Sequence, residues 1–287
     1  MSVTPGAPVD GTVVVEGRTV GFRLVGPDNG RPLVWLHGFG GSRLEQHPDT
    51  SISHRVGVRL VAVDRPGTGM SGPRPRFGLE DVGRDVVAVL DELRVDRFAV
   101  AGLSWGGPYA AALAVRYPDR VSRLGLVSAM GGWLTGAGAA RDAGPSFAAV
   151  ARMSRFPAAM RVALRASAWR FGRNPEAAVA SIRDAEARQP AVRDMLVAKT
   201  REAVCGGIAG QVDDTLAVVH PWPFSLGDVK VPTTVWWGDA DTEITEAMAR
   251  RTAAEIPDAR LVVVPGAGHL LYLRVWEEIL TTLTPHP

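Results

Sequence analysis

The fold expected for this chain follows from one stretch, FAVAGLSWGG at residues 98–107. Its first four residues form a short apolar run that is typical of a buried strand, and residues 108–117 have the spacing of a helix. Between them, GLSWG matches the pattern G-x-S-x-G in the strand-turn-helix setting that this pattern requires. The stretch therefore predicts a strand that turns sharply into a helix, with Ser104 at the turn.

Ser104 stands between Gly102 and Gly106 in that turn. A serine hydroxyl is a poor nucleophile at neutral pH, so the turn must present its oxygen to a base, and small neighbours let the chain bend. We therefore predict that Ser104 is a nucleophile. The alternative is that Ser104 only caps the following helix, a position that serine favours.

Strands and helices alternate outward from this stretch. Short apolar runs bounded by Gly, Pro or charged residues predict strands at residues 33–36, 60–63, 98–101 and 124–127. Helical spacing occurs at residues 79–93 and 108–117. The alternation predicts an α/β fold with a mostly parallel sheet, and a hairpin at residues 12–15 and 19–24 adds antiparallel strands at one edge.

The alternation breaks at Met130 and resumes after Pro232. We predict a helical insertion at residues 130–226 and a core domain made of residues 1–129 and 227–287. Within the insertion, apolar residues recur at spacings of three and four, interrupted by Pro157. This stripe consists of Val150, Met153, Phe156, Met160 and Leu164. The core is completed by strands at 233–237 and 261–264 and by helices at 243–256 and 271–283.

A glycine-rich loop, HGFGG at residues 37–41, follows the strand predicted at 33–36. Its glycines leave the backbone bare at the carboxyl end of a strand, where amide groups stabilise the negative charge that acyl transfer develops on a carbonyl oxygen. We predict that the N–H groups of Phe39 and Trp105 are the two donors. His37 is expected to brace this loop by hydrogen bonding.

Two further loops carry an acid and a histidine at the ends of predicted strands. GDAD at residues 238–241 follows one strand, and PGAGH, which ends in His269, follows the next. In open α/β sheets sites assemble at this edge, and the chain order Ser, Asp, His is typical of one hydrolase class. We predict that His269 takes the proton from Ser104 and that Asp241 orients the imidazole. Asp239, nearer the strand end, is the alternative acid.

The composition excludes several classes of protein. Lys plus Arg number 32 and Asp plus Glu number 30, so a net charge of +2 offers no strong field for nucleic acid. Cys205 is alone, so no intramolecular disulfide and no cysteine zinc site are expected, and a cytoplasmic location fits. Because neither a leader-like start nor about 18 consecutive apolar residues occur, we expect neither secretion nor membrane spanning.

No cofactor and no metal are expected from the remaining motifs. GTGMSG at residues 67–72 fits the dinucleotide pattern G-x-G-x-x-G, but Pro73 and Pro75 block the helix that should follow. His47 and His54 share a possible helical face, but no third ligand accompanies them. The first motif is therefore interpreted as a turn and the two histidines as surface residues.

Several of these motifs together resemble the α/β-hydrolase superfamily over residues 12–283. They are the loop at 37–41, DRPGTGMS at 64–71, the Ser104 turn, and the loops at 238–241 and 266–269. The resemblance implies an eight-stranded sheet flanked by helices, a helical cap between strands six and seven, and no cofactor. Epoxide hydrolases and haloalkane dehalogenases have an aspartate at the position of Ser104, so their covalent chemistry is disfavoured.

The run SWGG at residues 104–107 is also similar to that of proline iminopeptidases. Aminopeptidase action needs carboxylates in the cap to hold the substrate amine. The candidates are Glu176, Glu186 and Glu202.

The expected function is hydrolysis of a small apolar ester, lactone or thioester through an acyl-enzyme on Ser104. The cap should choose the substrate, and the residues expected to line its pocket are His37, Trp133, Met153 and Trp169. The same chemistry also suits carbon–carbon bond hydrolysis, perhydrolysis, aminopeptidase action, and a biosynthetic acyl transfer or cyclisation. An alternative from another class is a ligand receptor that keeps the fold without turnover.

Overall fold

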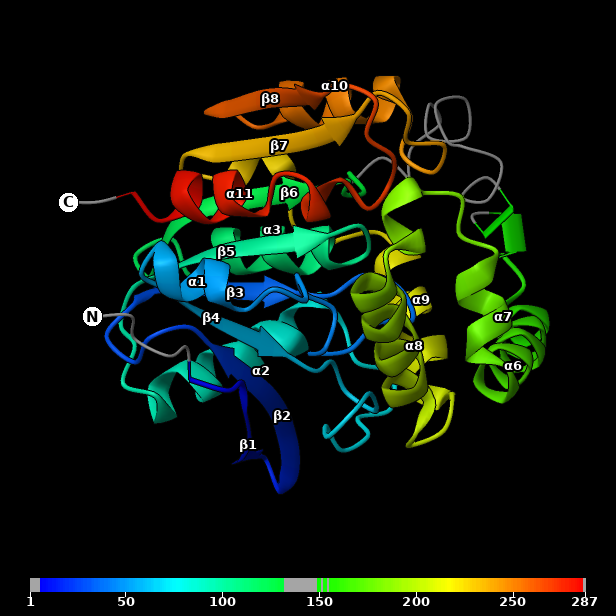
Figure 1. Cartoon of the computed structure of the whole chain (residues 1–287). Helices are drawn as coiled ribbons and strands as arrows, with labels where there is room; N and C mark the ends of the chain where they lie inside the picture. The colour runs from blue at the N-terminus through cyan, green and yellow to red at the C-terminus, as the bar shows by residue number, and fades with distance from the viewer. Residues whose placement is uncertain (1–5, 132–148, 151, 154, 286–287) are drawn as a thin grey trace.

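The computed structural model describes residues 6–131, 149–150, 152–153 and 155–285. Within these residues one eight-stranded sheet forms, in the strand order β1-β2-β4-β3-β5-β6-β7-β8 (Figure 1). Its strands are β1 (Val9–Val15), β2 (Arg18–Val25), β3 (Arg31–Leu36), β4 (Val58–Val63), β5 (Phe98–Leu103), β6 (Val121–Val127), β7 (Thr233–Gly238) and β8 (Ala259–Val264). All neighbouring pairs from β4 to β8 are parallel, so the predicted mostly parallel sheet is confirmed.

The hairpin expected at the start of the chain forms the edge of the sheet. β1 and β2 pair antiparallel, with Val15 opposite Arg18, and β2 then pairs antiparallel with β4. The two turn residues, Glu16 and Gly17, have φ angles of 49° and 79°. Positive φ at both positions gives the turn a twist that matches the twist of the strands.

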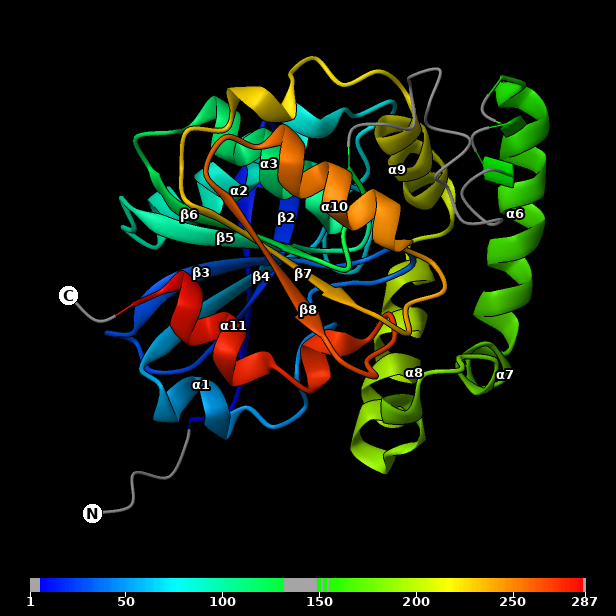
Figure 2. The same cartoon turned by 90° about the horizontal axis from the view of Figure 1, so that it is seen from above.

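Helices cover both faces of the sheet, each over its own hydrophobic core (Figure 2). One face carries α2 (Leu79–Glu92), α3 (Gly106–Arg116) and α10 (Glu246–Glu255), and the other carries α1 (Ser51–Arg55), the 3-10 turn η4 (Leu271–Leu273) and α11 (Trp276–Leu283). β5, in the middle, is buried at every position, as expected for a strand that is covered on both sides.

Between β6 and β7 the chain leaves the sheet and forms a helical insertion. Its described helices are α6 (Pro157–Arg173), α7 (Pro175–Ala180), the 3-10 turn η2 (Ala185–Arg188), α8 (Pro190–Val204), α9 (Ala209–Val219) and the 3-10 turn η3 (Leu226–Asp228). Helices α6 to α9 stand beside the carboxyl ends of the central strands (Figure 1). The expected fold, with helices inserted between the sixth and seventh strands, is confirmed.

α6 begins at Pro157, the residue that interrupts the predicted apolar stripe, because proline fits the first turn of a helix and breaks its interior. Another helix differs from the sequence prediction. The helix expected at residues 271–283 is divided into η4 and α11. In η4 the ring of Tyr272 packs on Trp35, with centroids 5.7 Å apart, and only then does α11 start at Trp276.

No helix among the described residues is both long enough and apolar enough to cross a membrane.

Candidate active site

Ser104 lies between β5 and α3 in a left-handed backbone conformation, with a φ of 50°. Such a conformation is strained for a residue with a side chain and persists only where neighbours enforce it. Here the Ser104 N–H donates to the Val127 carbonyl at 2.9 Å, and the Ser104 carbonyl accepts from the Gly107 N–H at 3.0 Å. A Cβ at Gly106 would lie 2.1 Å from the Leu36 carbonyl oxygen, so glycine is required there.

The loop after β3 packs against this turn. A Cβ at Gly38 would lie 3.6 Å from the Ser104 Cβ, which places the two backbones side by side. The Gly38 N–H donates to Glu45 Oε2 at 2.7 Å. The Phe39 N–H makes no hydrogen bond within the described residues, and the Phe39 ring lies 5.3 Å from the Trp105 ring between centroids. The loop thus holds the Phe39 amide near Ser104 and leaves it available to a ligand.

Arg65 holds the loop after β3 in place through hydrogen bonds. Its guanidinium donates to the carbonyls of His37 at 2.6 Å and Gly38 at 2.9 Å, and it pairs with Asp214 of α9 at 2.8 Å. Asp214 also accepts from the Tyr109 hydroxyl at 2.6 Å. Since Arg65 and Asp214 are both buried, they compensate each other's charge, and the pair ties the insertion to the loop.

His37 is buried, and its Nδ1 lies 3.0 Å from the Gly38 carbonyl. Its Nε2 lies 3.5 Å from the Arg65 N–H. Burial and the positive charge of Arg65 hold the pKa of His37 well below its ordinary value, so this histidine is neutral and serves the loop.

The loops after β7 and β8 bring Asp241 and His269 together. His269 Nδ1 lies 2.9 Å from Asp241 Oδ2, and Asp241 Oδ1 accepts from the N–H groups of Glu243 at 2.8 Å and Ile244 at 3.0 Å. The tautomer that donates from Nδ1 leaves Nε2 as an acceptor. Asp239 instead accepts from the Gly266 N–H at 2.6 Å, so it joins the two loops and does not contact His269.

The electrostatic environment of His269 favours its protonated form. Burial lowers the pKa of His269, but the hydrogen bond and negative charge of Asp241, with a further contribution from Asp184, outweigh this effect and raise the pKa above its ordinary value of 6.5. The imidazole is 22% exposed, so it remains open on one side. An imidazole poised in this way accepts and returns a proton near neutral pH.

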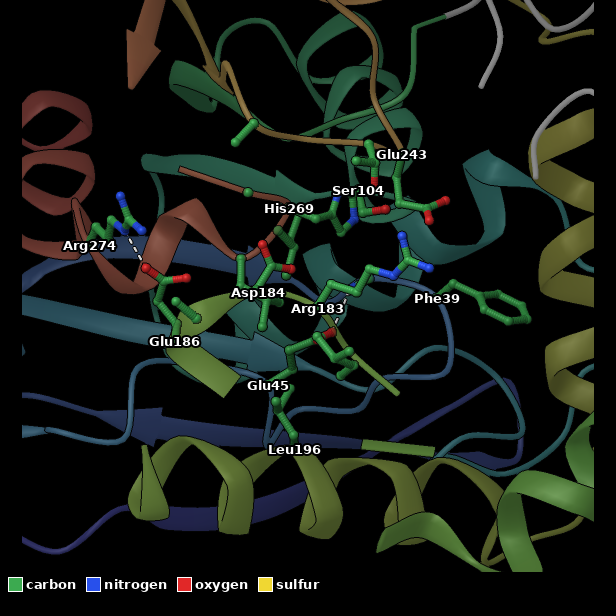
Figure 3. A pocket seen from close by; sticks show the side chains of 18 of the residues that line it. Phe39, Glu45, Ser104, Arg183, Asp184, Glu186, Leu196, Glu243, His269 and Arg274 are labelled. Carbon is green, nitrogen blue, oxygen red and sulfur yellow. Dashed lines mark hydrogen bonds and ion pairs between the residues drawn. The ribbon is translucent and has the colours of Figure 1, made fainter. Parts of the chain in front are cut away.

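Ser104 and His269 line one cavity of about 760 Å³. Figure 3 shows their side chains next to each other at its wall. The Ser104 hydroxyl makes no hydrogen bond within the described residues, and such contacts often tighten only when a substrate binds. The opposite side of the cavity comes from the insertion, from η2 with the residues just before it and from α8.

Comparison with known proteins places this architecture in a family. The family model of the alpha/beta hydrolase fold matches residues 31–274. The chain is an α/β hydrolase. Among solved structures, a hydrolase from Pseudomonas aeruginosa has a TM-score of 0.74 at 24% identity, covering 96% of this chain and 98% of that one.

Two curated relatives of this α/β hydrolase match nearly its full length. One is the dihydrolipoyllysine-residue acetyltransferase component of the acetoin cleaving system of Pseudomonas putida, 29% identical over 92% of this chain. The chain spans only 65% of that relative's length. The other is the 2-hydroxy-6-oxononadienedioate/2-hydroxy-6-oxononatrienedioate hydrolase of Cupriavidus pinatubonensis, 29% identical over 90% of this chain and 88% of the relative.

Three of the four residues expected to line the pocket of the α/β hydrolase, His37, Met153 and Trp169, do not line this cavity. His37 is buried beneath the loop. Trp169 is 62% exposed on α6 with Arg173 over its ring, and Met153 packs against the core of the sheet's other face. Trp133 lies outside the described residues.

The three acidic residues considered for an aminopeptidase are already paired with arginines. Glu176 pairs with Arg201 at the surface. Glu202 pairs with Arg43, and Glu186, which lines the cavity, pairs with Arg274. None of these carboxylates is therefore left to hold a substrate amine within the described residues.

Sequence reasoning missed the charged side chains that line the cavity of this α/β hydrolase. They are Glu45, Arg183, Asp184, Lys199, Glu243 and Arg274. No motif surrounds them in the sequence, and their common feature, a position on the wall of the cavity that Ser104 and His269 also line, exists only after folding.

Proposed function

We propose that this α/β hydrolase is a serine hydrolase that cleaves a small carboxylic ester, lactone or thioester. One observation carries the proposal: His269 Nδ1 lies 2.9 Å from Asp241 Oδ2, at a cavity that Ser104 also lines. The strained conformation of Ser104 supports it, because such strain clusters at functional sites.

In the proposed reaction His269 Nε2 takes the hydroxyl proton as Ser104 Oγ attacks the substrate carbonyl carbon. Asp241 holds the imidazole and stabilises its protonated form, while the N–H groups of Phe39 and Trp105 donate to the developing oxyanion. The bond to the leaving group then breaks, and His269 returns the proton to that group. Water, activated by His269, attacks the acyl-enzyme, releases the acid and restores Ser104.

The helical insertion has its own part in this proposal. We assign the chemistry to a core of residues 1–129 and 227–287 and substrate selection to a cap of residues 130–226. The cavity supports this division, because its reacting groups follow the strands of the sheet while its opposite side comes from η2 and α8.

The test is covalent labelling by a fluorophosphonate, together with turnover of 4-nitrophenyl esters. We expect stoichiometric labelling of Ser104, localised by mass spectrometry, and complete loss of labelling in Ser104→Ala. Ser181, another serine at the cavity, serves as the matched control, and Ser181→Ala should still be labelled. Ligand binding without labelling or turnover would instead favour a receptor that keeps the fold.

A second candidate is hydrolysis of a carbon–carbon bond. It is favoured by the Cupriavidus relative, whose named substrate contains ketone, hydroxyl and carboxylate groups but no ester, so that its hydrolysis must break a bond between carbons. Incubation with that oxo-dienedioate and mass spectrometry of the products would separate the two candidates. Two smaller acids whose summed mass equals substrate plus water would support carbon–carbon cleavage.

A further inference from the structure

The basic side chains of the cavity differ in whether an acidic partner neutralises them. Lys199 pairs with Glu45, and Arg274 pairs with Glu186. Arg183 also lines the cavity and is exposed, yet it has no ion-pair partner among the residues that the structure describes. Among the basic side chains in the described part of the cavity wall, Arg183 is therefore the one whose positive charge no acidic side chain compensates. That charge is available to a ligand.

The neighbouring residue holds Arg183 close to the reacting groups. The Asp184 carboxylate lies close to His269, whose charge and backbone N–H both oppose the rise that burial causes in the pKa of Asp184. A Cβ at Gly268 would lie 1.6 Å from Asp184 Oδ1, so this carboxylate packs directly on the loop that carries His269. The insertion is thus fastened to that loop one residue away from Arg183.

The direction of the Arg183 side chain agrees with this placement. In Figure 3 it extends across the cavity, and its guanidinium points toward Ser104 and Glu243. Glu243 forms no ion pair with Arg183 within the described residues, so the guanidinium keeps its donors available. A guanidinium presents a planar fork of N–H groups that matches the two oxygens of a carboxylate.

We infer that Arg183 binds a free carboxylate of the substrate, so that the preferred substrates carry an acid group a short distance from the carbonyl that Ser104 attacks. This inference rests on the proposed function for the nature of the bond that is cleaved. It also replaces the apolar substrate expected from the sequence with an anionic one.

The kinetic test compares two esters that differ only in charge at the end of the acyl chain, 4-nitrophenyl butyrate and mono-4-nitrophenyl succinate. We expect Arg183→Gln to lower kcat/KM for the succinate ester by at least about tenfold, the worth of a charge-assisted hydrogen bond, and to leave the butyrate ester within about twofold. The matched control is Arg188→Gln, an exposed arginine of η2 that does not line the cavity, which should change neither value.

A second test measures binding without turnover. Monomethyl succinate is titrated calorimetrically into Ser104→Ala and into the same variant with Arg183→Gln added. We expect binding to the first and at least about tenfold weaker binding to the second.

The two tests separate failure of the inference from failure of the proposed function. If the wild type hydrolyses both esters and Arg183→Gln changes both values by the same factor, or neither, the inference is overturned while the esterase function stands. If the wild type hydrolyses neither ester, the esterase function fails. The calorimetric comparison then tests by itself whether Arg183 binds a carboxylate. Equal affinity of the two Ser104→Ala proteins for monomethyl succinate, or no binding to either, then overturns the inference.

Discussion

The loops at the ends of β5, β7 and β8 hold their side chains through backbone hydrogen bonds, whereas the insertion is tied to the same cavity through charged side chains. Ser104 is held by the Val127 carbonyl and Asp241 by two amides, all within the core. The insertion reaches the core through Asp214 and Lys199, which pair with Arg65 and Glu45. The geometry for chemistry therefore depends on the strand ends, while charge at the cavity depends on the insertion.

The largest effect is expected from a substitution in the loops at the strand ends, at Asp241. Asp241→Asn keeps the shape of the side chain but favours the wrong imidazole tautomer, so we expect kcat to fall by about 10⁴-fold. Steady-state kinetics on a 4-nitrophenyl ester measures this fall. Asp239→Asn is the matched control in the same loop, and a fall as large in that variant would transfer the role of the acid to Asp239.

The next largest effect is expected from loss of the ion pair between Asp214 of the insertion and Arg65 of the core. Asp214→Ala leaves the Arg65 guanidinium buried without its partner, so we expect the free energy of unfolding to fall by about 3–5 kcal/mol. Denaturant unfolding measures the loss. Asp213→Ala removes a half-buried carboxylate that, within the described residues, accepts from the Arg76 N–H, and it should cost far less. Equal losses would mean that the buried ion pair has no special weight.

Two basic residues of α8 sharpen the comparison within the insertion. Lys199 pairs with the buried Glu45, and Lys199→Ala should lower the free energy of unfolding by about 1–3 kcal/mol because it leaves that carboxylate uncompensated. Arg201 is 60% exposed, and Arg201→Ala should change it by less than about 0.5 kcal/mol. Thermal unfolding of both variants measures these losses. A larger loss in Arg201→Ala than in Lys199→Ala would contradict the role given to the pair of Lys199 and Glu45.

The smallest expected effect is on the pH dependence of activity. Because the pKa of His269 is raised and the neutral form is the base, kcat/KM should rise with pH on a limb whose midpoint lies above 6.5. The negative charge of Asp184 contributes to that rise in pKa, so Asp184→Asn should move the midpoint to lower pH. A midpoint that stays in place would show that this residue of the insertion does not act on His269 through its charge.

The raised pKa of His269 also determines how the contribution of this residue to the stability of the fold changes with pH. A histidine whose folded pKa exceeds its unfolded value stabilises the fold at low pH, and this contribution is lost as the pH rises through the folded pKa. Activity and this part of stability are therefore expected to change in opposite directions across the same pH range.

Much of the strand-end region could be predicted from the sequence because its signals are local. GLSWG between an apolar run and a helix predicts a turn of the kind that the structure has at Ser104, and the glycines are needed because a Cβ would meet backbone atoms. The chain order of strands and helices likewise predicts the parallel sheet. The helix prediction fails at residues 271–283 for a reason that is not local, since Leu271 and Tyr272 are buried and the Tyr272 ring packs on the distant Trp35.

The sequence by itself determined the sheet, the insertion between β6 and β7, and which loops carry Ser104, Asp241 and His269, because each depends on a short pattern and on the rule that parallel strands end at one edge. Only the tertiary structure decided the wall of the cavity. Lys199 meets Glu45 across 154 residues and Asp214 meets Arg65 across 149, and no local spacing encodes such pairs. Charges so far apart in the chain become partners only when packing brings them together and removes the water between them.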